Sequence, residues 1–524
     1  MAAPSFPHPS HRPALTRRTL LGGGVALIAA GALAGCGGSG DSAGAKGRGG
    51  TLTVGFDNEP TTLDPALSSA ISSDRSVLNL FYDTLLRQQR DGSFVPALAE
   101  KWTVEGTTVT FTLRAGVTFH DGTPFDAEAA AFNLRRVIDP ATKSTKAGAL
   151  RKLAAVDVVD ARTLRLTLKA TDPLLLVQLA HEPGMMASPT AVKAGEYGRK
   201  PVGTGPFVFD AWRSKVQLTG KRNPKYWRKA ADGTALPRLD QVVYRFVTDT
   251  KVLRAEISTG GVQLVRVLPP EEFGQLKSDR QVVLEDIGVR RSYYVALNAT
   301  RAPFDDPKLR EAFAMAVDRA GVGKAAAAGE FDLAPSFATR NDWFFDGSIT
   351  PPPLDPAKAK AALGGRPVPI TVVARRRAPD PTIAELLQSQ LTAAGFDPKV
   401  EVLEAQTQLD RMRKQDFDAA LLVIDVPRLD PSLSFDPYFA SKGSNNWSGL
   451  ADAELDGLLE KAVGTEDRAV RKQAYVDVQR RIVGQNYWVF LHQPRSPLIH
   501  SAKLTGIVLN VDGQWRLDEA ELAS

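Results

Sequence analysis

The amino-acid sequence predicts an α/β protein built from more than one domain, and three observations support this class. Segments with a hydrophobic residue at every second position alternate with segments of helical periodicity, notably across residues 241–289 and 370–424. The chain has 524 residues, which exceeds the size at which a single hydrophobic core stops growing. Low complexity is confined to one short stretch near the start, so we expect the rest of the chain to fold.

Two segments have the clearest strand pattern. In "TVTFTLRAG" (108–116) three hydrophobic residues alternate with threonines, and in "RTLRLTLKA" (162–170) three leucines lie two residues apart. Alternation of this kind places the hydrophobic side chains on one face of a sheet. We therefore predict two half-buried strands here.

Helices are indicated by capping residues next to amphipathic segments. Asp306 precedes a proline and a segment with helical spacing, which is typical of a helix start. Another helix is predicted over 384–394, ended by Gly395, and a third over 452–463, ended by Gly464.

The start of the chain has the composition of an export signal. The pair Arg17–Arg18 precedes a glycine-softened apolar segment of fifteen residues, 20–34. A membrane-spanning helix needs about twenty apolar residues, so this segment is too short to span. The sequence therefore predicts that residues 1–35 are a twin-arginine lipoprotein signal peptide, removed after export.

Cys36 is the only cysteine of the chain and directly follows this segment. The stretch "LAGC" (33–36) resembles the bacterial lipobox, in which the cysteine receives a lipid and becomes the mature N-terminus. Acyl chains of this kind hold a protein at the membrane face. Residues 36–50 are rich in glycine and serine and are predicted to be a flexible tether. We therefore expect Cys36 to be the site of lipid attachment and the protein to lie at the extracytoplasmic face of the membrane.

Charge argues against a nucleic-acid partner. The chain has 65 Lys and Arg against 59 Asp and Glu, so removal of the signal peptide with its three arginines would leave a net charge of +3. A small excess spread over such a length is not the footprint of a nucleic-acid-binding protein.

Catalytic and metal motifs are missing from the sequence. It contains no G-x-S-x-G, H-E-x-x-H or S-x-x-K pattern, the spacings that place the groups needed for hydrolysis. Its six histidines are scattered, whereas a metal site needs clustered ligands. We expect no enzymatic activity, no cofactor and no metal, and an extracellular hydrolase stays a remote alternative.

Seven stretches, in order along the chain, resemble the bacterial extracellular solute-binding proteins of family 5, which include dipeptide-, oligopeptide- and nickel-binding proteins of ATP-binding-cassette (ABC) importers. They are "EPTTLDP" (59–65), "NLFYDTLLR" (79–87), "PALAEKW" (96–102), "VTFTLRAGVTFHDGTPFDAEAAAFNLRRV" (109–137), "PVGTGPFVF" (201–209), "NPKYW" (223–227) and "YVALNATRAPFDDPKLREAFAMAVDR" (294–319).

The resemblance implies a two-lobed clamp of the large, class II periplasmic-binding-protein type with an extra α+β subdomain. Its first lobe would comprise residues 51–82, 189–290 and 492–524, with residues 83–188 as the inserted subdomain. The second lobe would comprise residues 291–491. Because the chain crosses between the lobes twice, closure could be a hinge motion with solute buried between them.

The function that the resemblance implies is binding of peptides outside the membrane and their delivery to an ABC permease with its ATPase subunits. The protein is expected to act as a monomer. A sugar, an opine-like compound or a metal chelate is the alternative cargo, and a sensor that reports occupancy is a further alternative.

Asp425 is the main candidate for a ligand-binding residue. It ends an apolar segment in "LLVIDVPRLDP" (421–431), and Pro427 would halt the strand soon after. In peptide-binding members of the family, an aspartate at the corresponding place pairs with the α-ammonium of the peptide. The spacing to Asp430 departs by one residue from the common pattern.

Further candidates lie in two other stretches. Arg375 and Arg376 follow the strand "ITVV" (370–373) and could offer guanidinium groups to a carboxylate, or face solvent. Asn446 and Trp447 belong to "NNWSG", where the indole could cover a ligand or pack in the core.

The remaining candidates come from the matched stretches themselves. Glu59 begins the first of them, and Thr204 and Gly205 lie in "VGTGPF", where glycines allow close approach of the backbone to a strand or a solute. His120, in "FHDGT", is interpreted as a residue that stabilises a turn rather than as a ligand.

Overall fold

The computed structural model describes residues 49–68, 71–289, 291–425, 430–465, 467–510 and 512–523, with the backbone alone at residues 71–74 and 425. The predicted signal peptide and Cys36 lie outside these residues. The described residues belong to one compact unit, and the lobe boundaries proposed from the sequence stay a prediction.

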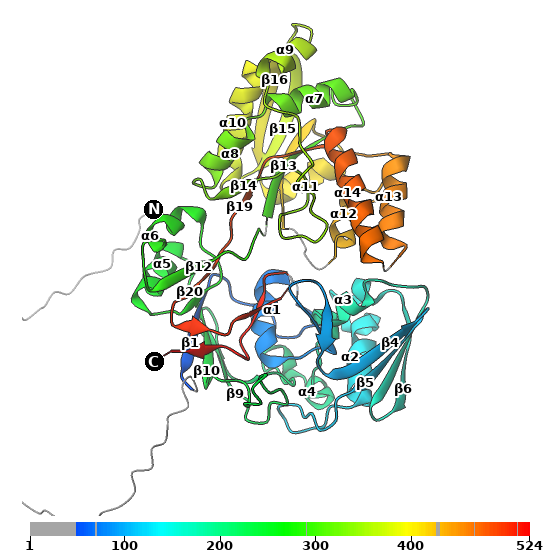
Figure 1. Cartoon of the computed structure of the whole chain (residues 1–524), viewed down its shortest axis with the longest axis vertical. Coiled ribbons are helices and arrows are strands. Elements are labelled where there is room, and N and C mark those ends of the chain that lie inside the picture. Colours follow the sequence, from blue (N-terminus) through cyan, green and yellow to red (C-terminus); the bar gives the residue numbers. More distant parts are fainter. Residues whose placement is uncertain are drawn as a thin grey trace, which may run out of the picture. The chain divides into compact units, whose positions relative to one another are not determined.

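The first sheet of the described chain has seven strands drawn from distant parts of the sequence (Figure 1). In spatial order they are β12 (Val282–Glu285), β20 (Leu498–Ser501), β11 (Leu264–Val265), β1 (Thr51–Phe56), β10 (Gln241–Phe246), β9 (Gln217–Arg222) and β8 (Phe207–Arg213). Its helices are α1 (Ile71–Phe81), α4 (Pro189–Ala194), α5 (Thr250–Thr259) and α6 (Phe273–Leu276). Parallel pairing of β1 with both β10 and β11 confirms the α/β class.

A four-stranded antiparallel sheet lies between β1 and β8 in the sequence. Its strands in order are β4 (Ala99–Glu105), β5 (Thr108–Leu113), β7 (Thr163–Leu168) and β6 (Leu153–Asp160). It is accompanied by the hairpin β2 (Leu86–Gln88) and β3 (Phe94–Pro96) and by helices α2 (Ala127–Ile138) and α3 (Leu175–Leu179). Strands β5 and β7 are the two predicted from alternation, and their hydrophobic residues are buried.

The third sheet has five strands, and its helices cover both faces. The strands in order are β16 (Phe396–Leu403), β15 (Val368–Arg375), β17 (Ala419–Asp425), β13 (Arg291–Leu297) and β18 (Trp488–Phe490). One face packs against α7 (Pro307–Ala316), α8 (Arg319–Ala326), α9 (Pro356–Ala362) and α10 (Asp380–Ala393). The other packs against α11 (Ala405–Arg413), α12 (Ser432–Phe439), α13 (Ala453–Val463) and α14 (Arg468–Gly484).

Several predicted helix starts are present at the expected residues. The side chain of Asp306 accepts a hydrogen bond from the Lys308 amide at the start of α7, and Asp452 does the same for Leu455 at the start of α13. Helix α10 begins at Asp380, four residues before the predicted start. The Asp380 side chain is buried and accepts hydrogen bonds from Arg375, a contact between helix and strand that periodicity does not reveal.

The chain passes twice between the seven-stranded and the five-stranded sheet, and these two crossings reach the five-stranded sheet at one edge. Strand β13 is antiparallel to β17 and β18, with Arg291 opposite Asp425 and Tyr294 opposite Phe490. The chain therefore enters β13 and leaves β18 at the edge where β17 ends. Because β15 runs parallel to β17, its end at Arg375 lies at this edge too. The chain then leaves through β19 (His492–Pro494), which pairs with β14 (Phe331–Leu333).

Candidate functional site

A cavity of about 220 Å³ is lined by five segments that lie far apart in the sequence. The segments are the tip of the β2–β3 hairpin, the crossing before β13, the loop before α9, the start of α14 and the C-terminal ribbon. Their lining residues are Arg90, Asp91, Ile287, Asn341, Asp342, Trp343, Arg468, Leu509, Asn510 and Gly513. This junction is the candidate site.

The hairpin tip is a tight turn that holds Asp91 in a fixed orientation. The Asp91 carboxylate accepts hydrogen bonds from the Ser93 amide at 2.8 Å and the Ser93 hydroxyl at 2.6 Å. Gly92 follows with φ of +85°, a conformation that favours glycine. The hydrogen bonds from Ser93 lower the pKa of Asp91, so this side chain is a carboxylate at neutral pH.

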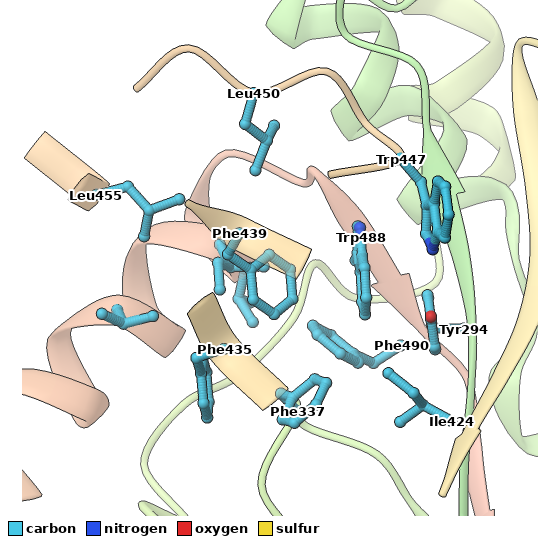
Figure 2. Close-up of a cluster of buried hydrophobic side chains, with 14 of the residues drawn as sticks. Tyr294, Phe337, Ile424, Phe435, Phe439, Trp447, Leu450, Leu455, Trp488 and Phe490 are labelled. Carbon is cyan, nitrogen blue, oxygen red and sulfur yellow. The ribbon is translucent and has the colours of Figure 1, made fainter. Parts of the chain in front are cut away.

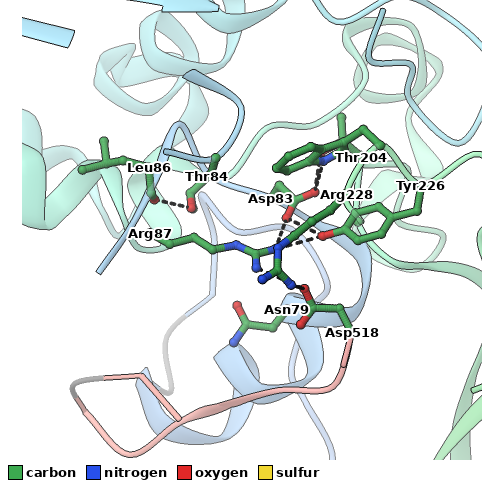
Figure 3. A network of polar contacts seen from close by, with 12 residues as sticks. Asn79, Asp83, Thr84, Leu86, Arg87, Thr204, Tyr226, Arg228 and Asp518 are labelled. Carbon is green, nitrogen blue, oxygen red and sulfur yellow. Dashed lines mark hydrogen bonds and ion pairs between the residues drawn. The ribbon is translucent and has the colours of Figure 1, made fainter. Parts of the chain in front are cut away.

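The hairpin is anchored by a buried polar network (Figure 3). Arg87 of β2 donates to Asp83 at 2.9 Å and to Asp518 at 3.0 Å, while Arg228 donates to Asp518 at 2.6 Å. Burial alone would raise the pKa of Asp518, but Arg87 and Arg228 lower it to about 2. The network therefore joins the hairpin to the C-terminal segment that carries Asn510 and Gly513.

The C-terminal ribbon consists of β22 (Val508–Leu509) and β23 (Trp515–Arg516) and packs against α1. Arg75 of α1 forms ion pairs with Asp512 and Glu182, and Asn79 donates to the Trp515 carbonyl at 3.1 Å. These contacts hold the turn between the two strands at the cavity.

Helix α14 presents an arginine to the cavity. Asp467 caps the helix through the amides of Ala469 and Val470, which places Arg468 at its first position. The Arg468 guanidinium donates to the main-chain carbonyl of Asp91 at 2.7 Å and lies 5.1 Å from the centre of the Trp343 ring.

Trp343 forms an aromatic wall of the cavity. Its ring packs edge-on against Phe344 and Tyr475, and the Arg471 guanidinium lies 5.7 Å from its centre. Arg471 in turn donates to both carboxylate oxygens of Asp430, at 2.7 and 2.8 Å. The cavity wall is thus connected to the segment that follows β17, where the sequence predicted a ligand site.

The crossing before β13 contributes a glycine that cannot accept a side chain. Gly288 has φ of +86°, and a Cβ there would lie 2.6 Å from the side chain of Asn341. Asn341 therefore packs directly on the backbone of the crossing. Ile287, which precedes Gly288, is buried and lines the cavity.

Two predicted ligand residues lie together at the edge of the five-stranded sheet. Asp425 ends β17 and Arg375 ends β15, and the structure describes only the backbone of Asp425. The Arg375 guanidinium donates to Asp380 at 2.8 and 3.3 Å. Arg376 is exposed, with Glu404 at 3.4 Å.

Asn446 and Trp447 are held by contacts beside the five-stranded sheet. The Asn446 side chain donates to the Leu450 carbonyl at 2.9 Å and accepts from the Leu450 amide at 2.8 Å. Trp447 belongs to a buried aromatic cluster that also contains Tyr294 and Trp488, whose rings stack 3.8 Å apart (Figure 2).

The predicted residues of the matched stretches have partners in the seven-stranded sheet and beside it. Thr204 is buried and donates to Asp83 at 3.4 Å (Figure 3), and the Gly205 carbonyl accepts from His120 at 2.9 Å. Burial lowers the pKa of His120. Glu59 accepts hydrogen bonds from Trp212 at 2.7 Å and from the hydroxyl of Ser214 at 3.1 Å.

None of the predicted ligand residues whose side chains are described lines the cavity. Sequence reasoning missed Arg90, Asp91, Trp343, Arg468 and Asn510, because these residues are spread over four segments that lie far apart in the sequence. The available signals were local: "DG" at 91–92 indicates a tight turn and Asp467 a helix start, but neither indicates that the two meet.

The described part of the chain shows neither a cluster of metal ligands nor a membrane-spanning helix. No group of three or more histidine, cysteine or carboxylate side chains there could hold a metal ion. Among the same residues, no helix combines the length and the apolar character that crossing a membrane requires.

Comparison with known proteins identifies the family. A profile of the bacterial extracellular solute-binding proteins, family 5, middle region, matches residues 93–446. The glutathione-binding protein GsiB of Shigella flexneri is 29% identical over 490 residues, which covers 88% of this chain and 92% of that protein.

Solved structures agree in fold. HbpA2 from Haemophilus parasuis superposes with a TM-score of 0.82 at 21% identity, over 91% of this chain and 100% of that one. The periplasmic murein tripeptide-binding protein MppA, in an unliganded open form, has a TM-score of 0.78 at 22% identity, over 92% and 99% of the two chains. DppA from Helicobacter pylori, in complex with the peptide STSA, has a TM-score of 0.73 at 24% identity, over 91% and 99%.

These comparisons confirm the predicted periplasmic-binding-protein fold and the class of solute-binding protein, since the matching family consists of binding proteins rather than enzymes. The chain belongs to the bacterial extracellular solute-binding proteins of family 5.

Proposed function

We propose that this protein is a lipid-anchored receptor that binds peptides outside the cell membrane and delivers them to an ABC permease with its ATPase subunits. Cys36 carries the anchor in this proposal, and the protein acts as a monomer. Residues 51–82, 189–290 and 492–524 form one lobe with the subdomain 83–188, and residues 291–491 form the other.

The observation that carries the peptide proposal is the likeness to glutathione-binding proteins over 88% of the chain. Glutathione is a tripeptide. The fold is shared with proteins described as binding the peptide STSA and a murein tripeptide.

The chemistry of the cavity suits a peptide. Its lining combines guanidinium groups, carboxylates, side-chain amides and the indole of Trp343. A peptide has charged ends and a polar backbone, so mixed donors and acceptors around an aromatic wall can bind it without depending on one side chain.

The edge of the five-stranded sheet supplies the second part of the proposed site. In this proposal Asp425 pairs with the ammonium group of the solute, because β17 ends at the edge where both chain crossings meet the sheet. Arg375, Arg376, Asn446, Trp447, Thr204, Gly205 and Glu59 are proposed to act around this group.

Isothermal titration of the purified protein with glutathione and with peptides of two to five residues tests the proposal. We expect at least one of them to bind with a dissociation constant of about 10 μM or tighter, equivalent to about 7 kcal/mol. Absence of heat with every peptide would reject peptides as cargo, and native mass spectrometry of the gently purified protein would then identify a retained sugar, opine-like compound or metal chelate.

The role proposed for Asp425 is tested with a variant and a matched control variant. Asp425→Asn should weaken binding by more than about tenfold, since a charge-assisted hydrogen bond would be lost. Asp397→Asn, an exposed aspartate of β16 in the same sheet, should leave the affinity unchanged. Equal affinities of the two variants would remove Asp425 from the site.

A further inference from the structure

The two carboxylates that line the cavity are already engaged as hydrogen-bond acceptors. Asp91 accepts from the amide and hydroxyl of Ser93. Asp342 accepts from the amide of Thr339 at 2.7 Å and from its hydroxyl at 2.9 Å. At each carboxylate both hydrogen bonds go to one oxygen, Oδ1 of Asp91 and Oδ2 of Asp342, and they hold the side chain in place.

The two guanidinium groups of the lining, unlike its carboxylates, have few hydrogen-bond partners. Within the described residues, Arg90 makes no hydrogen bond or ion pair, and Arg468 makes one hydrogen bond, to a main-chain carbonyl. No described carboxylate lies within ion-pair distance of either group. Most of their N–H donors therefore remain available to an acceptor in the cavity.

The other arginines of α14 differ from Arg468, because each of them has a carboxylate partner. Arg471 binds Asp430, Arg480 binds Asp346 and Arg481 binds Asp452, each at 2.7 Å. Arg468 is the residue of this group that faces the cavity, and its guanidinium is oriented by the ring of Trp343 instead of by a carboxylate.

Asn510 adds a buried polar group to the same lining. Its exposed fraction is 7%, and its side-chain amide makes no hydrogen bond within the described residues. The amide can therefore donate to, or accept from, a group that enters the cavity.

We infer that this cavity receives a carboxylate group of the solute, bound by Arg468 and Arg90 and supported by the amide of Asn510. The inference rests on the proposed function and deepens it by naming the part of the solute that this cavity recognises. A guanidinium group presents parallel N–H donors that match the two oxygens of a carboxylate. Stacking on Trp343 holds Arg468 in place before the ligand arrives, which reduces the entropy lost on binding.

The test compares free acids with amides on protein purified after export by its own signal. Tri-alanine, tri-alanine amide and Ala-Ala-Glu are titrated into the wild type and into Arg468→Gln, Arg90→Gln and Arg480→Gln. Arg480 is the matched control, because it lies on the same helix and pairs with Asp346 away from the cavity. Circular dichroism and thermal melting confirm that each variant is folded.

We expect the wild type to bind tri-alanine at least tenfold more tightly than its amide. Arg468→Gln should abolish that preference and Arg90→Gln should reduce it, while Arg480→Gln should keep it. If Ala-Ala-Glu alone depends on Arg468, the recognised group is an acidic side chain rather than the peptide terminus. Two outcomes overturn the inference. In the first, the wild type binds tri-alanine no better than its amide and Ala-Ala-Glu no better than either. In the second, Arg468→Gln keeps each preference of the wild type.

A separate arm distinguishes failure of this inference from failure of the proposed function. If no peptide binds the wild type, peptides are rejected as cargo, and succinate and inorganic phosphate become the probes. Succinate binding that is lost in Arg468→Gln supports the carboxylate site. Binding of neither anion, or tighter binding of phosphate than of succinate, overturns it.

Discussion

His492 lies in an environment that does not favour the charged form of its side chain. Its side chain is 0% exposed, and neither ring nitrogen has a hydrogen-bond partner in the described residues. The ring stacks on Tyr293 at 4.8 Å with an angle of 4° between the planes, and Phe331 packs edge-on at 6.1 Å. Tyr293 follows one chain crossing and His492 begins the other, so this stack joins the two.

Burial lowers the pKa of His492 to about 4, and this predicts a loss of stability in acid. In the unfolded state the histidine has a pKa of about 6.5 and binds a proton, whereas in the folded state it stays neutral down to about pH 4. The free energy of unfolding should therefore fall as pH drops from about 6.5 to about 4. His492→Phe keeps the stack and removes the titration.

The free energy of unfolding, measured by urea denaturation between pH 4 and 8, checks this. The wild type should lose about 3 kcal/mol more than His492→Phe over this range. Parallel curves for the two proteins would show that His492 is not held neutral by burial.

At the scale of elements, the loop "VGTGPF" packs against the end of α1 with no room for a side chain. A Cβ on Gly205 would lie 2.6 Å from the Leu80 carbonyl oxygen and closer still to the backbone of Phe81. The Gly205 amide also donates to the Phe81 carbonyl at 2.9 Å. Because the neighbouring atoms are backbone, they cannot move aside as a flexible side chain could.

Gly205→Ala should therefore destabilise the protein by roughly 3 kcal/mol, the upper part of the range for overpacking. Gly457→Ala is the matched control, since Gly457 lies inside helix α13 and a Cβ there meets nothing within 4 Å. Alanine is the better helix former, so this control should stabilise by up to about 1 kcal/mol. Melting temperatures that shift in the same direction for both variants would contradict this prediction.

At the scale of the whole molecule, the proposal depends on a tether that lies outside the described residues. Cys36 is predicted to carry the lipid, and the compact unit begins after it. Lipid attachment would hold the binding protein near its permease without a membrane-spanning helix.

Cys36→Ser should release the exported protein from the membrane fraction, because the serine hydroxyl cannot accept the thioether-linked lipid. Fractionation of cells and labelling with radioactive palmitate measure this. Ser42→Ala, in the same predicted tether, should stay in the membrane fraction and keep the label. Retention of the unlabelled Cys36→Ser variant at the membrane would show that another segment anchors the chain.

Local features were predictable because their causes are local. An aspartate beside a helical repeat supplies the hydrogen bonds that start a helix, as at Asp306 and Asp452. Alternation along 108–113 and 163–168 is enough to place a strand and its buried face. The family resemblance also depends only on residues next to one another.

The sequence by itself therefore determined the fold class, many of the elements and the family. Only the tertiary structure decided that Arg375 binds Asp380 and that Arg90, Trp343, Arg468 and Asn510 share a cavity. The physical reason is that sheet pairing and the two chain crossings bring together residues separated by hundreds of positions. A charged side chain is bound by whichever partner lies nearest in space, and no local pattern records that distance.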